Sequence, residues 1–212
     1  MDALSSEIKR YLSIYNKNTT TDNNLEISFG KSLGKYIFDT NVSNKYWKKV
    51  YNMLEKKGDF TLRKDFTYRI YTSNDKRLYI DKDDKMRCTK RTLMESCICY
   101  KEEETIGDMK ITLYNKKLIN TAKFPSLWDY DNAIRRETLS YHFNGFYINL
   151  SVSKPLEGDG EPIHNITIMI LSKNNKVSRN ILIKNIMKQI HDIYTVFNLK
   201  DVSFKTYNYG TE

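Results

Sequence analysis

Basic side chains recur on the polar faces of several short segments in which every second residue is apolar. In such a segment one face can pack against a core while the other face presents polar groups. The basic candidates are Arg69, Arg77, Arg91, Lys110, Arg135 and Arg136. Guanidinium groups bind phosphate oxygens through two parallel hydrogen bonds, and unpaired buried charges are costly. An interior lined by these residues therefore predicts a polyphosphate ligand, with a triphosphate as the natural anion.

Carboxylates are few on the same polar faces. In the segment Asn24–Gly30 the polar face carries Asn24, Glu26 and Ser28. A single carboxylate among arginines is usually a structural counter-charge, so Glu26 alone is weak support for catalysis. Divalent metal ions that assist hydrolysis select several oxygen ligands. The number of carboxylates in the interior therefore decides between an enzyme and a binding protein.

The composition favours a polyanionic partner. The 212 residues include 35 Lys and Arg against 26 Asp and Glu, a formal net charge of +9. This charge suits RNA, DNA or a nucleotide, although surplus surface lysine produces the same excess. The cysteines Cys88, Cys97 and Cys99 complete neither a zinc site nor a disulfide framework, which favours a reduced environment. No stretch approaches the roughly 20 apolar residues of a membrane span. We therefore expect an intracellular protein of the nucleus or cytoplasm with no membrane partner.

Three segments have helical periodicity. The predicted helices cover residues 4–15, 43–57 and 178–197. Ser43 and Ser178 are the predicted N-terminal caps of the second and third helices, and Gly58 closes the second. No Pro-, Gly- or Ser-rich linker divides the chain. We therefore expect a single domain over residues 1–212, with a helix and polar lead-in at 1–22 and a C-terminal helix at 176–197.

Between the second and third helices the periodicity changes to two. Strands are predicted near residues 65–72, 76–82, 86–100, 108–114, 134–142, 146–154 and 163–171, in addition to the segment at 24–30. Asn144-Gly145 predicts a hairpin with a type I′ turn. About eight strands are enough to close a barrel and remove exposed edges. The predicted fold is α+β, a closed antiparallel β-barrel with the helices packed outside.

Several of these segments match the motifs of one family. Asn24–Gly30 is similar to a strand that reads Glu-x-Glu followed by a short apolar stretch and Gly, and Arg135–Tyr141 is similar to an Arg-rich strand ending in Ser-Tyr. Asn149–Ser153 matches a strand that reads Asp-Leu-Thr-x-Val, and Asn165–Thr167 matches a second Glu-x-Glu. Over roughly residues 22 to 195 the chain resembles the triphosphate tunnel family, the metal-dependent RNA 5′-triphosphatases of fungal, protozoan and large-DNA-virus mRNA capping.

The chain departs from the family where the family carries acids. Asn24, Asn149, Asn165 and Thr167 stand at positions that the resemblance assigns to metal-binding acids, and Lys116 falls near a further family glutamate. Neutral oxygens cannot supply the negative charge that offsets a divalent metal ion. Glu26 is then the surviving metal ligand and catalytic residue only if the protein is active. Alternatively, the acids at 102–104 or Glu137 enter the interior and restore the site.

The resemblance implies three candidate functions. The first is an RNA 5′-triphosphatase-like protein of a capping or transcription system, weak or inactive as a hydrolase, that binds an RNA 5′ end or a nucleoside triphosphate. The second is an active polynucleotide 5′-phosphatase that uses Mg²⁺ or Mn²⁺ to remove the γ-phosphate of nascent RNA. The third is a non-catalytic barrel that docks a guanylyltransferase or an RNA polymerase subunit. Only the second requires a cofactor.

Overall fold

Eight antiparallel strands close into a barrel, as the alternation predicts. The structure is a computed structural model that describes residues 2–17, 23–35, 37–101, 107–124, 130–170, 177–199 and 204–209. The barrel strands are β1 (Asn23–Ser32), β3 (Leu62–Ser73), β4 (Lys76–Asp81), β5 (Met86–Tyr100), β6 (Asp108–Ile119), β7 (Asn132–Phe143), β8 (Phe146–Pro155) and β9 (Ile163–Ile170). Around the barrel the order is β5, β4, β3, β7, β8, β9, β1 and β6, and β6 pairs again with β5. The predicted closed barrel is confirmed.

Two short strands extend this sheet outside the ring. β2 (Phe38–Asp39) pairs with the end of β1, and β10 (Lys205–Tyr209) pairs with the second half of β5. Neither was predicted, because each is short and owes its strand conformation to a partner that is distant in the sequence. The 3₁₀ helix η1 (Thr121–Lys123) follows β6.

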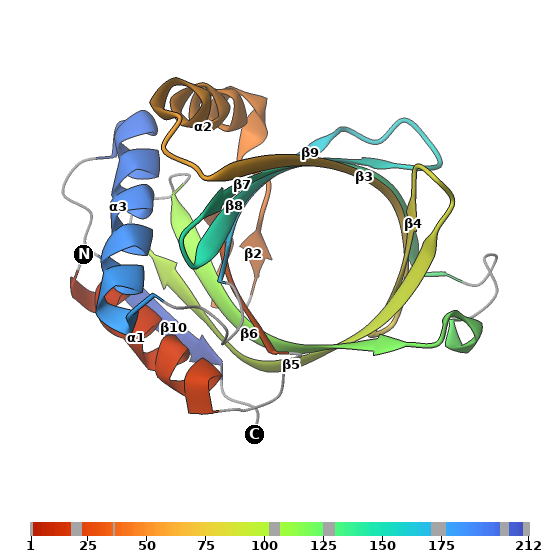
Figure 1. Cartoon of the computed structure of the whole chain (residues 1–212), viewed down its shortest axis with the longest axis horizontal. Helices are drawn as coiled ribbons and strands as arrows, with labels where there is room; N and C mark the ends of the chain where they lie inside the picture. Colours follow the sequence, from red (N-terminus) through yellow and green to blue (C-terminus); the bar gives the residue numbers. More distant parts are fainter. Residues whose placement is uncertain are drawn as a thin grey trace.

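The three predicted helices are present, and they lie together on one side of the barrel (Figure 1). They are α1 (Asp2–Lys17), α2 (Ser43–Lys57) and α3 (Arg179–Val196). Leu25, Ile27 and Phe29 of β1 point outward from the barrel into the core that these helices cover. None of the described helices is long and apolar enough to cross a membrane.

The opposite side of the barrel has little cover. There the outward residues Leu78, Ile80 and Cys88 form a small cluster with Phe124, which follows η1. All three cysteines are buried and unpaired. The main core therefore lies beside the barrel and not inside it, which leaves the interior of the barrel for polar groups.

Two predicted details of the turns and caps differ in the structure. Val42, not Ser43, occupies the cap position of α2, and the Asn41 side chain accepts hydrogen bonds from the Ser43 backbone N–H (3.2 Å) and the His164 backbone N–H (3.1 Å). Asn41 thereby ties the start of α2 to β9. The hairpin between β7 and β8 forms as predicted, but Gly145 (φ 96°) is its only residue with positive φ. A type I′ turn needs positive φ at both central residues, so that turn type was wrong.

Candidate functional site

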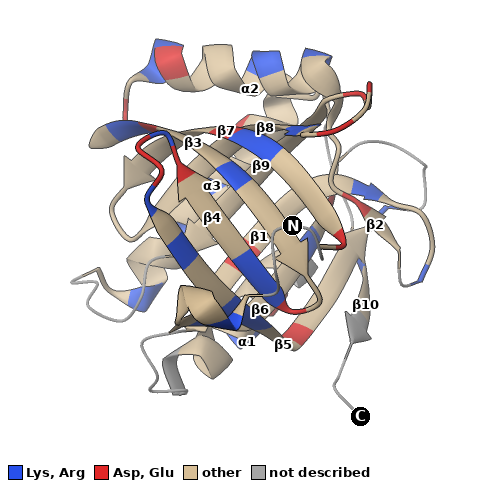
Figure 2. Cartoon of the chain, turned by 90° about the vertical axis from the view of Figure 1, so that its right-hand side faces the viewer, with Lys and Arg blue, Asp and Glu red and all other residues tan. Residues whose placement is uncertain are grey.

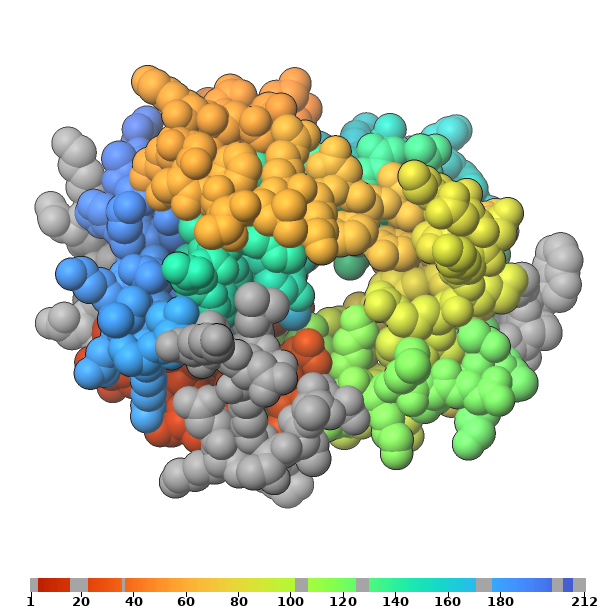
Figure 3. All heavy atoms as spheres, viewed as in Figure 1, coloured from red at the N-terminus to blue at the C-terminus, as the bar shows by residue number. Residues whose placement is uncertain are grey.

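The barrel encloses a cavity of about 560 Å³. Its lining comes from all eight barrel strands and from Thr40, which lies between β2 and α2. In the space-filling view an opening is visible at the centre of the barrel, bordered by residues of β3, β4 and β6 (Figure 3). A cavity of this size, lined by converging polar side chains, is a candidate ligand site.

Cations dominate the charged groups of this lining. The cationic residues are Lys64, Arg77, Arg87, Arg91, Lys116 and Arg136, and Glu26 is the only carboxylate among the described residues that line the cavity. In Figure 2 the bands of Lys and Arg recur along the barrel strands that face the viewer. The lining of the cavity therefore has a clear excess of positive charge.

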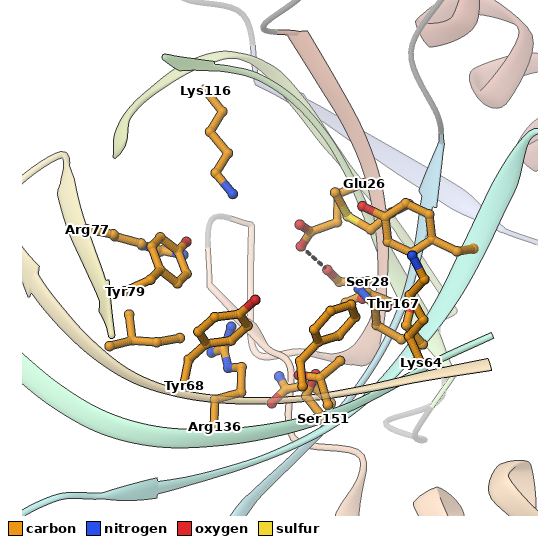
Figure 4. Close-up of a pocket in the computed structure, with 18 of the residues that line it drawn as sticks. Glu26, Ser28, Lys64, Tyr68, Arg77, Tyr79, Lys116, Arg136, Ser151 and Thr167 are labelled. Carbon is orange, nitrogen blue, oxygen red and sulfur yellow. Dashed lines mark hydrogen bonds between the residues drawn. The ribbon is translucent and has the colours of Figure 1, made fainter. Parts of the chain in front are cut away.

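Four strands next to one another carry most of these cations. Arg77, Arg87, Arg91 and Lys116 come from β4, β5 and β6, while Lys64 comes from neighbouring β3. The opposite strands β1, β8 and β9 contribute Ser28, Asn149, Ser151, Asn165 and Thr167 together with Glu26. Figure 4 shows Arg77 and Lys116 pointing into the cavity from one side, and Glu26 and Thr167 from the other. The cavity thus has a basic wall facing a floor of hydroxyls and amides.

Glu26 is already engaged by neighbouring side chains. Its Oε1 accepts a hydrogen bond from Ser28 Oγ (2.9 Å), and its Oε2 accepts one from the Tyr114 hydroxyl (3.4 Å). The Arg91 guanidinium lies 3.7 Å from Glu26 Oε2 and stacks over the Tyr114 ring at 4.0 Å. Burial by itself lowers the pKa of Arg91, but the attraction of Tyr114 and Glu26 outweighs it, so the pKa is raised. Arg91 and Glu26 therefore form a local ion pair.

The other five cations of the lining make no ion pair with any carboxylate of the described residues. Burial and the nearby Arg77 lower the pKa of Arg136, whose Nε donates a hydrogen bond to Ser153 Oγ (2.9 Å). Burial, together with Arg91, Arg87 and Arg77, also lowers the pKa of Lys116. A lowered pKa means that the surroundings disfavour the charged form of a cation. The cavity is therefore electrostatically incomplete without an anion.

Tyr79 lies within this group of cations. The Lys116 Nζ lies 5.1 Å from the centre of its ring, and the Arg87 Cζ lies 5.2 Å from it. Burial alone raises the pKa of the Tyr79 phenol, but Lys116, Arg91 and Arg77 lower it further than burial raises it. The wall thus stabilises negative charge at this position, which is the property that a phosphate site requires.

The described lining suits an anion better than a divalent metal ion. No group of three or more His, Cys, Asp or Glu in the described parts of the chain is placed to hold a metal ion. Asn149 Oδ1 and Asn165 Oδ1 are buried without a hydrogen-bond partner, but they are neutral, and Glu26 is already paired with Arg91. Mg²⁺ and Mn²⁺ select charged oxygen ligands, and the surrounding cations repel them. The Mg²⁺ or Mn²⁺ expected of an active enzyme therefore does not fit this donor set.

The structure brings together seven of the predicted site residues. Glu26, Arg77, Arg91, Arg136, Asn149, Asn165 and Thr167 all line the cavity. Arg69 and Arg135 lie on the outer face, because their neighbours Tyr68, Ile70 and Arg136 face inward and alternate residues of a strand face opposite sides. Arg69 pairs with Asp84, and Arg135 with Glu137 (3.0 Å). These two positions in the predicted phosphate site are corrected by the structure.

Several other predicted positions lie outside the lining or outside the described residues. Lys110 and Asn24 are on the inward side of β6 and β1 by alternation but lie outside the residues that line the cavity. Glu137 is exposed on the outer face, so it does not supply an acid to the interior. The acids at 102–104, the other predicted source, lie outside the described residues.

Three of the six cations were not among the predicted phosphate-binding residues, although Lys116 was noted near a family glutamate position. Lys64 lies in β3 before the strand start that was predicted, and Lys116 lies in β6 beyond its predicted end. Arg87 falls inside a correctly predicted strand, at the same alternation as Arg91. Extending the inward alternation of Arg91 back along β5 would have identified Arg87, whereas the other two needed longer strands than the apolar pattern indicated.

Two solved structures have the same architecture. No protein-family model and no curated protein sequence matches the chain. The S. pombe Pct1 RNA triphosphatase matches with a TM-score of 0.70 and 11% identity, over 92% of this chain and 92% of that chain. Pct1 in complex with the Spt5 CTD matches with a TM-score of 0.69 and 10% identity, over 91% and 93% of the two chains. The chain has the triphosphate-tunnel fold.

The tunnel fold accounts for the position of the cavity. The likeness covers the barrel and the helices beside it, and at 10–11% identity it concerns the fold and not the side chains. The resemblance predicted from the motifs is confirmed at the level of architecture. The interior described above is therefore the tunnel itself, and its chemistry has to be argued from the residues of this chain.

Proposed function

We propose that the tunnel binds the 5′-triphosphate end of RNA, or a nucleoside triphosphate, in an mRNA capping or transcription system, with little or no hydrolysis. The observation that carries the proposal is the lining of the tunnel, six cationic side chains with one carboxylate among its described residues. The fold likeness to an RNA triphosphatase supports the choice of ligand. The proposal also places the protein in the nucleus or in a cytoplasmic, virus-like system.

A polyphosphate chain supplies what the tunnel lacks. Arg77, Arg87, Arg136, Lys64 and Lys116 have no ion pair with a described carboxylate, and each can donate to phosphate oxygens. Arginine binds such oxygens through two parallel hydrogen bonds, and lysine binds them as a point charge. Inside a partly enclosed cavity these contacts are stronger than the same contacts in bulk water. Binding would also relieve the repulsion that lowers the pKa of Lys116 and Arg136.

The same lining argues against efficient hydrolysis. The resemblance assigns metal-binding acids to Asn24, Asn149, Asn165 and Thr167, which are neutral here. Glu26 remains, but it is paired with Arg91. Metal-assisted attack of water on a γ-phosphate needs charged ligands that hold the metal against the phosphate. We therefore propose binding without a metal cofactor, and an active triphosphatase that uses Glu26 is the competing function.

Binding is tested with a matched pair of variants on adjacent residues. Triphosphate-ended RNA is titrated against the native protein, Arg136→Ala and Arg135→Ala at low salt without divalent ions. Arg136 faces the tunnel and Arg135 faces solvent. Loss of a hydrogen bond to a charged group costs about 1.5–3 kcal/mol, so Arg136→Ala should weaken binding by about 10- to 150-fold. Arg135→Ala should change it by less than about threefold. Equal effects of both changes would contradict a ligand inside the tunnel.

Hydrolysis is tested by γ-phosphate release from the same RNA with Mg²⁺ or Mn²⁺, comparing the native protein with Glu26→Ala. We expect no turnover above the buffer rate from either protein. Metal-dependent turnover that Glu26→Ala abolishes would establish the competing function, an active RNA 5′-triphosphatase.

Protein partners belong to the same proposal. A guanylyltransferase or a polymerase subunit would suit a capping or transcription role, and one solved structure that the chain resembles is a complex of Pct1 with the Spt5 CTD. A stable complex of this chain with such a protein, together with no RNA binding, would favour the docking function over the binding function.

A further inference from the structure

Three aromatic rings line the tunnel on the neighbouring strands β3, β7 and β8. His142 and Tyr147 are cross-strand partners beside the hairpin turn that joins β7 to β8, so they lie at the end of these strands. Phe66 of β3 pairs with Thr138, four residues before His142 along β7. All three rings line the cavity. Phe66, His142 and Tyr147 are called the aromatic mouth.

The rings of the aromatic mouth present flat faces. Phe66 stacks on Tyr68 with ring centres 6.1 Å apart and an interplanar angle of 18°, and His142 stacks on Tyr147 at 5.3 Å and 20°. The Phe66 side chain is among the large apolar groups that stay exposed, with 36% of its surface accessible. An exposed aromatic ring in a polar cavity has no packing role on its accessible face, and such a face can stack on a nucleobase.

A guanidinium lies close to the Phe66 ring. Phe66 pairs with Thr138, and Tyr68, two residues further along β3, pairs with Arg136. Phe66 and Arg136 are therefore diagonal neighbours on the inner face of the sheet. Such a diagonal pair has α-carbons about 7–8 Å apart, less than the length of a nucleotide. Arg77, Arg91 and Lys116 line the cavity from the neighbouring strands β4, β5 and β6. Along β3, Lys64 is the inward residue before Phe66, and Tyr68 is the inward residue after it. The Lys64 side chain therefore lies on the other side of Phe66 from Tyr68.

The imidazole of the mouth adds no positive charge near neutral pH. Burial and the nearby Lys64 lower the pKa of His142, so its ring is neutral there. Its Nε2 lies 3.3 Å from Ser140 Oγ, and this hydrogen bond fixes the plane of the ring against Tyr147. The rings of the mouth therefore carry no positive charge themselves near neutral pH.

We propose that the aromatic mouth holds the first nucleoside of the triphosphate chain, with its base stacked on Phe66 and its phosphates extending inward to Arg136 and Lys116. This inference rests on the proposed function and names the substrate class more narrowly. The ligand is a nucleotide or an RNA end, and an inorganic polyphosphate lacks the group that the mouth binds. Lys64 then lies where it can contact the phosphate that links the first nucleoside to the second.

The floor beside the mouth is consistent with a sugar. Ser140 pairs with Asn149 across β7 and β8, next to the pair of His142 and Tyr147. Both residues line the cavity and carry hydrogen-bonding groups without charge. Ribose hydroxyls both donate and accept hydrogen bonds, whereas phosphate oxygens accept them. A floor of hydroxyls and amides therefore suits the sugar, and the cationic wall suits the phosphates.

The test compares three ligands on four proteins. Inorganic tripolyphosphate, GTP and a triphosphate-ended RNA are titrated in metal-free buffer against the native protein, Phe66→Ala, Phe66→Tyr and Thr67→Ala. Thr67 is the next residue on β3, is exposed and faces away from the tunnel, so its change is the matched control. Thermal unfolding of each protein confirms that it is folded.

The expected result is a selective loss. Because stacking on an aromatic ring contributes about 1–3 kcal/mol per base, Phe66→Ala should weaken binding of GTP and RNA by about 5- to 150-fold. Binding of tripolyphosphate should stay within about twofold. Phe66→Tyr should bind like the native protein because the ring remains, and Thr67→Ala should change nothing.

The outcomes separate this inference from the proposed function. If the native protein binds tripolyphosphate as tightly as GTP, or if Phe66→Ala weakens both equally, the mouth holds no base and the inference is overturned, while phosphate binding in the tunnel stands. If no ligand binds the native protein at low salt, the proposed function fails and the inference fails with it.

Discussion

Replacing Lys116 by Met should stabilise the free protein and weaken its ligand binding at the same time. Lys116 points into the tunnel, and burial together with Arg91, Arg87 and Arg77 lowers its pKa. The folded state therefore disfavours its charge. Its one favourable contact of note is the Tyr79 ring, 5.1 Å from Nζ, and a cation over a ring contributes about 0.5–2 kcal/mol. Met keeps the length of the side chain and removes the repulsion.

The change should raise the free energy of unfolding of the free protein and lower its affinity for the ligand. Replacing even a buried ion pair by apolar groups of similar volume is often neutral or stabilising by about 1–4 kcal/mol, so a partly buried charge without an ion-pair partner should also gain from such a replacement. We expect a gain near the lower end, about 1 kcal/mol, because the ring contact is lost as well. For a chain of this size 1 kcal/mol raises the melting midpoint by about 2–4 °C. Loss of a charged hydrogen bond to phosphate should weaken tripolyphosphate binding by about 10- to 150-fold.

The assay is thermal unfolding at low salt, with and without tripolyphosphate, for the native protein, Lys116→Met and Lys117→Met. Lys117 is the next residue on β6, is exposed and faces away from the tunnel. Lys117→Met therefore removes the same charge outside the tunnel and is the matched control. We expect the melting midpoint of Lys116→Met to be higher without ligand and to rise less when ligand is added. A lower midpoint with an unchanged ligand shift would refute the electrostatic reasoning.

Three further predictions concern other parts of the molecule. Glu26→Gln removes the only described carboxylate of the lining, so tripolyphosphate titrations should show tighter binding by about two- to tenfold if the tunnel holds an anion. Affinity for triphosphate-ended RNA should fall in the alkaline range just below the usual lysine pKa, because the lowered pKa of Lys116 means that it loses its proton earlier than an exposed lysine. In Lys116→Arg the side chain stays charged over this range, so the fall in affinity should disappear from the pH profile. Asn41→Ala removes the acceptor for the Ser43 and His164 backbone N–H groups and should lower the free energy of unfolding by about 1 kcal/mol in denaturant titration, with phosphate binding unchanged.

The alternation of apolar residues carried most of the fold prediction. A period of two locates a strand and divides its faces, and it identified all eight barrel strands because each packs one face against helices or a small cluster. It does not identify which face is inside a barrel when both faces are polar. β3 begins with residues that are nearly all exposed, and there Arg69 was placed inside while Lys64 and Phe66 were not considered.

The prediction was also wrong for one of two adjacent arginines. Arg135 and Arg136 were both assigned to the ligand, but consecutive residues of a strand face opposite sides, and the structure gives the tunnel to Arg136 alone. The aromatic mouth could not be predicted from the sequence for a different reason. Phe66 and Tyr147 are far apart in the sequence, and only the pairing of β3, β7 and β8 brings them into the lining of the same cavity.

The stability of the barrel and the chemistry of its interior depend on different residues. The apolar core lies between the helices and the outer faces of strands such as β1, so the inward side chains contribute little to that core. Among the described residues, the wall of β3, β4 and the first half of β5 has on its outer side the small cluster around Leu78 and Ile80. Its inner side carries most of the lining cations that have no ion pair with a described carboxylate. That wall is the part of the barrel with the least apolar support and the greatest electrostatic strain. An anion bound to it would stabilise the folded state where the core does not reach, since any ligand that binds only the folded protein does so.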